Sequence, residues 1–202
     1  MKKLVFDYVM KLSFSSPVTD HRFQLRCTPA TGPRQQIVDV KIGIEPDVDY
    51  DTAVDSFDSV VLTGYMPQPH SFFDYEVSGI AFVDTLHTAT EAFKPLYRFD
   101  SVLTRPGRRL DGLIEECGRR IEERHEIHSS IEKARIVMHE VYRDFVYTPG
   151  ATTIRTTAEK ALAQGKGVCQ DYAHVMLAAC RHLDVPARYI AGLLGGEGAT
   201  HA

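Results

Sequence analysis

The sequence predicts an α+β fold with an antiparallel β-sandwich over residues 1–85, a connector over residues 86–109 and a core rich in helices over residues 110–202. Three observations support this division. Apolar and polar residues alternate in the first segment, apolar residues recur at three- and four-residue steps in the last, and the segment between them has no sustained period. Side chains alternate along a strand and recur about every 3.6 residues along a helix, so the change of period indicates a change from strands to helices.

The predicted strands are most regular near the N-terminus. From Leu4 to Phe14 every second residue is apolar, which is the period of a strand with one buried face. The runs "SVVLTGYM" and "FFDYEVSGIAFV" also resemble strands, and proline, glycine and aspartate residues separate them. The same alternation predicts one apolar face made of Val38, Val40, Ile42 and Ile44.

Two helices with start signals are predicted next. The apolar stripe of the first consists of Ile131, Ala134, Val137, Met138, Val141, Tyr142 and Phe145. Ser129 and Glu132 have the spacing of a capping box before this stripe. Thr156 and Glu159 repeat that spacing before a second helix, which Gly165 can end in the left-handed conformation.

A third helix is predicted to start near Cys169. Its inward side chains are expected to be Ala173, Met176, Leu177, Cys180 and Leu183. Val185 and Pro186 stop it, because the residue before a proline avoids the helical conformation. The segment "ARYIAGLL", residues 187–194, then has the composition of a strand.

Charge and hydropathy limit the kinds of partner that this protein is expected to have. The net charge is −4, with 9 basic and 14 acidic residues up to residue 100, and 14 basic and 13 acidic residues after it. Neither half has an excess of positive charge, which argues against a nucleic-acid partner. Asp7 and Lys11 interrupt the apolar N-terminus before a signal peptide could form, and no apolar run reaches membrane-spanning length. The sequence therefore predicts a cytoplasmic protein without a membrane partner.

The stretch "GKGVCQDYAH" contains the most informative of the four cysteines. Their density and spacing do not fit a disulfide framework or a zinc ribbon, so all four are predicted to be free thiols. At a helix start, unpaired N–H groups and the helix dipole favour the negatively charged thiolate of Cys169, the form that acts as a nucleophile. Gly165 and Gly167 leave room for a tight turn and a substrate main chain. The alternative is a small buried residue, which is the interpretation for Cys27, Cys117 and Cys180.

The choice of a base is partly geometric. His174 follows Cys169 by five positions, about 500° around a helix, so it cannot easily reach the thiol and is predicted to be a packing or surface residue. Asp171 fits a role in the first helical turn, and His182 lies at the far end of the helix. His201 follows a glycine-rich turn, and a returning strand could bring it beside the helix start.

The segment "GKGVCQDYAHVMLAACRHLDVPARYIAGLL", followed by "THA" and preceded by "FVYTPGATTIRTTAEKAL", resembles the core of the transglutaminase-like superfamily, in its bacterial cysteine-protease branch. The resemblance runs from about residue 127 to the end. The N-terminal segment is similar to the β domain that precedes this core. It departs from the family at "DSFDSVV", where members usually have glycine and asparagine after an aspartate.

The resemblance implies a papain-like fold in which Cys169 is the nucleophile and His201 the base. It places the third member of the triad, an aspartate, beyond Ala202, so we expect a truncated core with impaired activity and an exposed sheet edge that favours homo-oligomers. The implied chemistry is attack of the thiolate on a peptide or amide carbonyl, a thioester, and release to water or an amine. The implied partner is a peptide or protein substrate, and no cofactor is implied.

Three alternatives stay open. A metal site at Cys169 and His201 would need two further ligands, which no nearby motif supplies. A calcium loop would use Asp47, Asp49, Asp51 and Asp58 of "DVDYDTAVDSFD" as its oxygen ligands. Thr52 stands where such a loop requires glycine, which favours a solvated acidic loop. The third alternative is a transglutaminase-like binding or scaffold module without turnover, against which the presence of both Cys169 and His201 argues.

Overall fold

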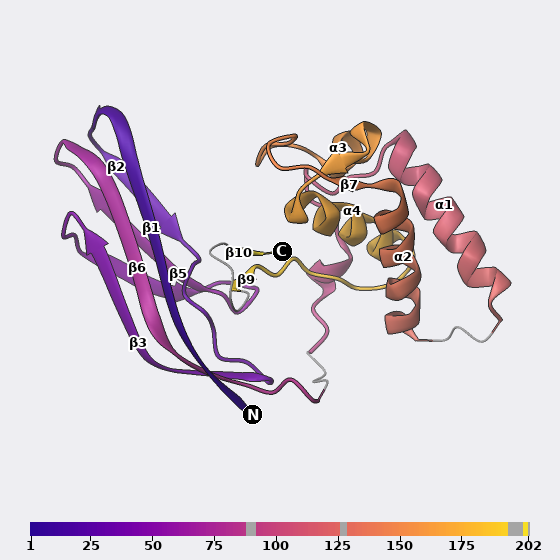
Figure 1. The fold of residues 1–202 in the computed structure, drawn as a ribbon, viewed down its shortest axis with the longest axis horizontal. Coiled ribbons are helices and arrows are strands. Elements are labelled where there is room, and N and C mark those ends of the chain that lie inside the picture. Colours follow the sequence, from indigo (N-terminus) through magenta and orange to yellow (C-terminus); the bar gives the residue numbers. More distant parts are fainter. Residues whose placement is uncertain (88–91, 126–128, 194–199, 202) are drawn as a thin grey trace. The chain divides into compact units, whose positions relative to one another are not determined.

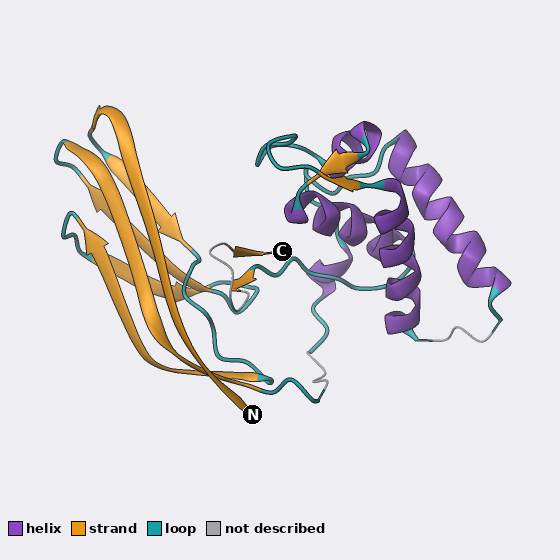
Figure 2. Ribbon diagram, in the orientation of Figure 1, coloured by secondary structure: helices purple, strands orange, loops and turns teal. Residues whose placement is uncertain are grey.

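The computed structural model describes residues 1–87, 92–125, 129–193 and 200–201, the last two by their backbone alone. The chain divides into two compact units, Met1–Glu91 and Ala92–Ala202. Strands make up the first unit, and helices dominate the second (Figure 2). The predicted α+β fold, with antiparallel strands before helices, is confirmed.

The first unit contains two antiparallel three-stranded sheets (Figure 1). One has the order β1 (Lys2–Val18), β6 (His70–Val83) and β3 (Gln35–Glu45). The other has the order β2 (His21–Leu25), β5 (Val60–Met66) and β4 (Tyr50–Val54). Side chains from both sheets fill one core, which contains Phe23, Leu25, Ile44, Leu62, Met66, Phe73, Tyr75 and Val77.

A bulge in β3 changes which side chains face this core. The register between β3 and β6 shifts at Asp39, whose φ is 54°. After the shift Ile44 is buried, whereas Val40 is 40% exposed. Before it Ile37, rather than Val38, pairs with a buried residue of β6. The prediction of one continuous apolar face is therefore wrong, because an extra residue in a strand reverses the alternation of side chains.

The acidic segment is not a loop throughout. Its central residues form β4, which pairs with β5 from Tyr50 to Val54 and exposes all five side chains. Asp55 then accepts hydrogen bonds from the N–H groups of Phe57 and Ser59, at 2.9 and 3.0 Å. The predicted solvated loop is thus wrong for β4, because the backbone of this polar segment bonds to a neighbouring strand while its side chains face solvent.

The described residues of the second unit form four α-helices and short strands. The helices are α1 (Arg108–Glu123), α2 (Ser130–Asp144), α3 (Ala158–Gln164) and α4 (Cys169–His182), and a 3-10 turn, η1, covers Pro95–Arg98. The strands β7 (Val146–Tyr147) and β8 (Lys166–Gly167) are parallel, and β9 (Gly192–Leu193) and β10 (Thr200–His201) are antiparallel. The middle of α4 is apolar almost all round, and Val175, Ala178 and Ala179 are fully buried in a core shared with α1, α2 and α3.

Two helix signals act as predicted. Ser129 and Glu132 form a capping box: the Ser129 hydroxyl accepts from the Glu132 N–H at 3.2 Å, and the Glu132 carboxylate accepts from the Ser129 N–H at 3.1 Å. Gly165 ends α3 with a φ of 64°, in the left-handed region that favours glycine.

The second predicted capping box is wrong. The N-cap of α3 is Thr157, whose hydroxyl accepts from the Lys160 N–H at 3.3 Å. Glu159 instead accepts from the N–H groups of Arg109 and Leu110, both at 2.9 Å, at the start of α1. Its carboxylate thus satisfies free donors of a helix that lies about 50 residues earlier in the chain.

The buried face of α2 is narrower than predicted. Ile131, Met138 and Tyr142 are 60%, 46% and 76% exposed, so their predicted burial is wrong. They lie about 80–120° around the helix from the mean direction of Val137 and Val141, which are buried, and so fall outside the stripe that meets the core.

The predicted strand over residues 187–194 is also shorter, since only Gly192–Leu193 is strand and Leu194 lies outside the described residues. The N–H of Ala187 donates to the carbonyl of Tyr97 at 3.0 Å, and its carbonyl accepts from the Arg181 guanidinium at 3.0 and 3.2 Å. These backbone groups are therefore not available for a strand ladder. Among the described residues no helix is both long and apolar enough to span a membrane.

Candidate active site

Cys169 is the first residue of α4, as predicted, and follows a parallel strand pair. Gly167 lies opposite Tyr147 in the β7–β8 pair, and the N–H of Thr148 donates to the Gly167 carbonyl at 2.8 Å. Val168 is extended, with φ −114° and ψ −178°, and the chain turns into the helix at Cys169. The strand pairing and the hydrogen bond from Thr148 hold the turn in place. Cys169 lies at the end of the turn and is half-buried.

Among the described residues, some backbone N–H groups of this turn donate hydrogen bonds, and one does not. The N–H groups of Asp171 and Tyr172 donate to the carbonyl of Val168 at 2.8 and 3.2 Å. The N–H of Val168 donates to Asp171 Oδ2 at 2.8 Å. In the part of the chain that the structure describes, the N–H of Cys169 has no hydrogen-bond partner. A free N–H at a helix start favours negative charge, either on the thiolate or on the oxygen of a carbonyl that the thiolate attacks.

Asp171 fixes the shape of the turn. Its side chain is buried, and Oδ2 also accepts a hydrogen bond from the Thr152 hydroxyl at 2.6 Å. A Cβ atom on Gly167 would lie 2.5 Å from that oxygen, so glycine is required for the carboxylate to fit. The predicted role of Asp171 in the first helical turn is confirmed. Its hydrogen bond with Thr152 also connects this turn to the segment that follows β7.

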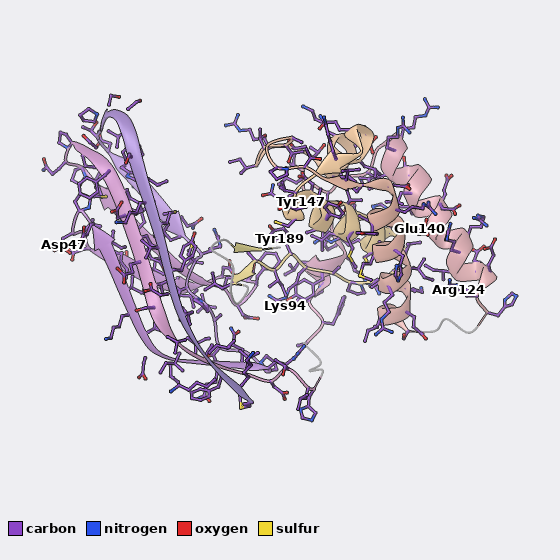
Figure 3. The ribbon with its side chains drawn as sticks, in the orientation of Figure 1. Asp47, Lys94, Arg124, Glu140, Tyr147 and Tyr189 are labelled. Atoms are coloured by element: carbon purple, nitrogen blue, oxygen red, sulfur yellow. The ribbon has the colours of Figure 1, made fainter. Side chains whose placement is uncertain are left out.

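His174 and Tyr189 share this environment. Their ring centroids are 5.5 Å apart, and His174 is buried, which confirms the packing alternative for this histidine. Burial lowers the pKa of His174, an effect that the charge of Asp171 partly opposes. Burial raises the pKa of Tyr189, and the negative charges of Cys169 and Asp171 raise it further. His174 is thus neutral and Tyr189 protonated near neutral pH (Tyr189 is labelled in Figure 3).

Aromatic side chains adjoin the Cys169 turn. The Tyr172 hydroxyl donates to the carbonyl of Phe145 at 3.0 Å, and the two rings meet edge to face with centroids 4.7 Å apart. Tyr147, also labelled in Figure 3, has its ring 6.5 Å from that of Tyr172 and is 57% exposed. Since Tyr172 follows Cys169 by three positions and Tyr147 lies opposite Gly167, these rings offer apolar surface close to the thiol.

The pairing of Cys169 with His201 is not tested. The backbone of His201 lies opposite Gly192 in the β9–β10 pair, and its side chain lies outside the described part of the structure. The proximity of the two side chains stays a prediction. His182, at the far end of α4, contacts Asp100 at 2.8 Å.

The remaining cysteines differ from Cys169. All four are free thiols, as predicted. Cys117 and Cys180 are buried, and burial is the main cause that raises their pKa values to about 12 and about 11. Cys27 is half-buried in the first unit. Among the described side chains, no group of three or more histidines, cysteines, aspartates and glutamates could hold a metal ion.

Sequence patterns do not identify Thr152, Tyr147 or Tyr189. Thr152 lies in an irregular segment without a period, and its contact with Asp171 spans 19 residues. Tyr189 falls in a predicted strand, where an aromatic residue is ordinary. Only the folded backbone brings these side chains to the turn that carries the thiol.

Two segments of the chain match models of known families. Residues 119–202 match the model of the transglutaminase-like superfamily, and residues 6–81 match the model of the bacterial transglutaminase-like N-terminal region. The two matched segments together cover most of the chain. The chain thus contains a transglutaminase-like core, preceded by a bacterial transglutaminase-like N-terminal region.

The fold is similar to a crystal structure from Cytophaga hutchinsonii described as a "Putative Cysteine Protease", with a TM-score of 0.76 and 19% identity over 98% of this chain and 70% of that one. An uncharacterized protein of Mycobacterium leprae is 26% identical over 190 residues, which cover 90% of this chain and 67% of the relative. An uncharacterized protein of Mycobacterium tuberculosis is 36% identical over 67 residues, 33% of this chain and 21% of that protein. The structural likeness supports the fold alone.

Proposed function

We propose that this protein is a transglutaminase-like cysteine protease or amidase, which acts on peptide or amide carbonyls through a thioester on Cys169. The observation that carries the proposal is the position of Cys169 as the half-buried first residue of α4, with its own N–H unpaired among the described residues. The match of residues 119–202 to the transglutaminase-like superfamily supports this reaction class. We propose a peptide or protein as the substrate, with the rings of Tyr147 and Tyr172 in contact with it.

The reaction has two halves. In the first, the Cys169 thiolate attacks the carbonyl carbon, and the N–H of Cys169 donates to the oxyanion that forms. The C–N bond then breaks, and the leaving amine takes the proton that His201 received from the thiol. In the second half, water or a primary amine attacks the thioester. The products are a carboxylic acid or a new amide, and the thiol is regenerated.

An activated ester tests the nucleophile directly. With p-nitrophenyl acetate, we expect a burst of p-nitrophenolate and one acetyl group on the peptide that contains Cys169, detected by mass spectrometry. Because this leaving group needs no proton, the test does not depend on proton transfer to the leaving group. A primary amine added at the second step then measures the division between transfer and hydrolysis.

Three variants complete the test. Cys169→Ala should abolish the burst, and Cys27→Ala, which removes the other half-buried thiol, should keep it. His201→Ala should slow acylation by roughly 10²-fold, the usual contribution of a general base. A folded chain whose Cys169 takes no acetyl group would instead support the non-catalytic binding or scaffold module. The cytoplasmic location and the absence of nucleic-acid and membrane partners stay predictions.

A further inference from the structure

Asp171 is a buried carboxylate that has no cationic partner among the described residues. It is 1% exposed, and none of the ion pairs among the described residues includes it. Oδ2 accepts from the Thr152 hydroxyl and the Val168 N–H, whereas Oδ1 is buried and has no hydrogen-bond partner in the described part of the chain. A buried charge is ordinarily paired, so this arrangement calls for an explanation.

The carboxylate joins three segments around the nucleophile. Thr152 belongs to the segment after β7, Val168 follows β8, and Asp171 itself lies in the first turn of α4. The contact with Gly167 is close enough to exclude any larger residue there. Asp171 therefore determines the path of the backbone on both sides of Cys169.

The charge of Asp171 also acts on a side chain, Tyr189, that the charge of Cys169 affects. Cys169 and Asp171 both raise the pKa of the same Tyr189 hydroxyl, after the larger effect of burial. Two side chains near the Asp171 carboxylate are the uncharged Thr152, which donates to it, and the buried His174, whose pKa is lowered by burial and, to a smaller extent, by the charge of Arg181. Thr152 and His174 carry no positive charge near neutral pH, and the Arg181 guanidinium donates to Thr104 and to the carbonyl of Ala187.

We propose that Asp171 is a positioning residue for the nucleophile, which fixes the turn that carries Cys169 and uses an unpaired negative charge to control when the thiol loses its proton. The inference rests on the proposed function, since it concerns the same thiol. A negative charge in the turn disfavours a lone thiolate and favours one that forms together with an imidazolium. With Asp171 in the turn, the Cys169 thiol therefore loses its proton mainly when a histidine base is in place to accept it.

The test measures the rate at which iodoacetamide alkylates Cys169 at pH 6.5, followed by peptide mass mapping. Asp171→Asn keeps an oxygen that can accept both hydrogen bonds but removes the charge. We expect about five-fold faster alkylation, because a negative charge that disfavours the thiolate has been removed from the same helical turn. Thr152→Val keeps the carboxylate but removes one of the two hydrogen bonds by which it holds the turn, so we expect about two-fold slower alkylation.

Thr148→Val is the matched control, because its hydroxyl lies in the same segment and bonds to the carbonyl of Val146. Its alkylation rate should not change. Opposite shifts in Asp171→Asn and Thr152→Val support the inference, while equal decreases in both, or no change in either, overturn it. If Asp171→Asn does not fold, Thr152→Val compared with Thr148→Val decides. Alkylation does not require turnover, so these shifts test Asp171 even where the acylation test of the proposed function fails.

Discussion

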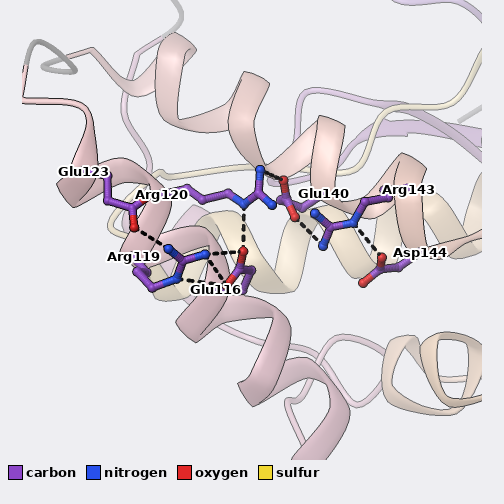
Figure 4. Close-up of polar contacts among 7 residues, drawn as sticks. All are labelled: Glu116, Arg119, Arg120, Glu123, Glu140, Arg143 and Asp144. Atoms are coloured by element: carbon purple, nitrogen blue, oxygen red, sulfur yellow. Dashed lines mark hydrogen bonds and ion pairs between the residues drawn. The ribbon is translucent and has the colours of Figure 1, made fainter.

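The second unit buries two carboxylates, each with a cysteine close to it, and their surroundings are opposite. Glu140, on α2, is 3% exposed and pairs with Arg120 at 2.9 Å and with Arg143 at 2.6 Å (Figure 4). Asp171 is 1% exposed, and its partners are a hydroxyl and a backbone N–H. Among the described residues, cations therefore pair with the charge of Glu140 but not with that of Asp171.

The difference separates a structural role from a chemical one. Arg120 contacts both Glu140 and Glu116, so the network shown in Figure 4 ties α1 to α2. The cysteine near Glu140 is Cys117, which is fully buried, and burial followed by the charge of Glu140 raises its pKa. The cysteine near Asp171 is half-buried at a helix start. The comparison indicates that Glu140 serves stability and that Asp171 serves the thiol.

The largest expected effect concerns the two thiols. The pKa of Cys117 is raised from 9.0 to about 12, so its thiolate fraction at pH 8 is about 10³-fold below that of an ordinary cysteine. Iodoacetamide followed by peptide mass mapping should label Cys169 first and Cys117 only after unfolding. Equal labelling of both in the folded chain would remove the distinction between the two regions, and faster labelling of Cys27 would contradict the special reactivity of Cys169.

The next effect is on stability. Glu140→Ala leaves Arg120 and Arg143 without their shared partner. We expect a loss of about 2–3 kcal/mol in the free energy of unfolding, below the ~3–5 kcal/mol of fully buried pairs, because both arginines are partly exposed. Urea unfolding measures this loss. Glu123→Ala, which removes an exposed partner of Arg119, is the control and should change stability by less than about 1 kcal/mol.

A third test displaces Asp171 without altering its charge. Gly167→Ala would place a Cβ atom 2.5 Å from Asp171 Oδ2, and we expect a loss of about 1–2 kcal/mol together with slower acylation of Cys169. Gly112→Ala is the control, because no heavy atom lies within 4 Å of its added Cβ and alanine favours the helix interior. Thermal melts should show opposite shifts, and two shifts of the same sign would mean that the turn tolerates the methyl group.

The smallest expected effect is the change of stability with pH in the acidic range. Hydrogen bonds from Arg119 and Arg120 lower the pKa of Glu116 from 4.5 to about 2. The contribution of Glu116 to stability is therefore present above pH 4.5 and is lost as the pH falls towards 2. Melts of the unaltered chain and of Glu116→Gln should differ most above pH 5 and converge near pH 2, by a small amount because the site is exposed. A constant difference across this range would show that the charge of Glu116 contributes nothing.

The sequence by itself determined the features that depend on neighbouring residues. The alternation from Leu4 to Phe14 predicted the strand β1, and Ser129 with Glu132 predicted the start of α2. The glycines and Cys169 predicted the end of α3 and the start of α4, and with it the position of the candidate nucleophile. Each of these signals acts over a few residues, through backbone conformation or hydrogen bonds within one turn, so it is visible in the sequence.

Only the tertiary structure decided which distant groups complete these elements. Glu159 caps α1 rather than its own helix, a bulge reverses the face of β3, and Thr152 completes the partners of Asp171. The physical reason is the same in each case. A buried donor or acceptor takes whichever partner the packed backbone brings within hydrogen-bond distance, and residues far apart in the sequence acquire that proximity only when the chain has folded.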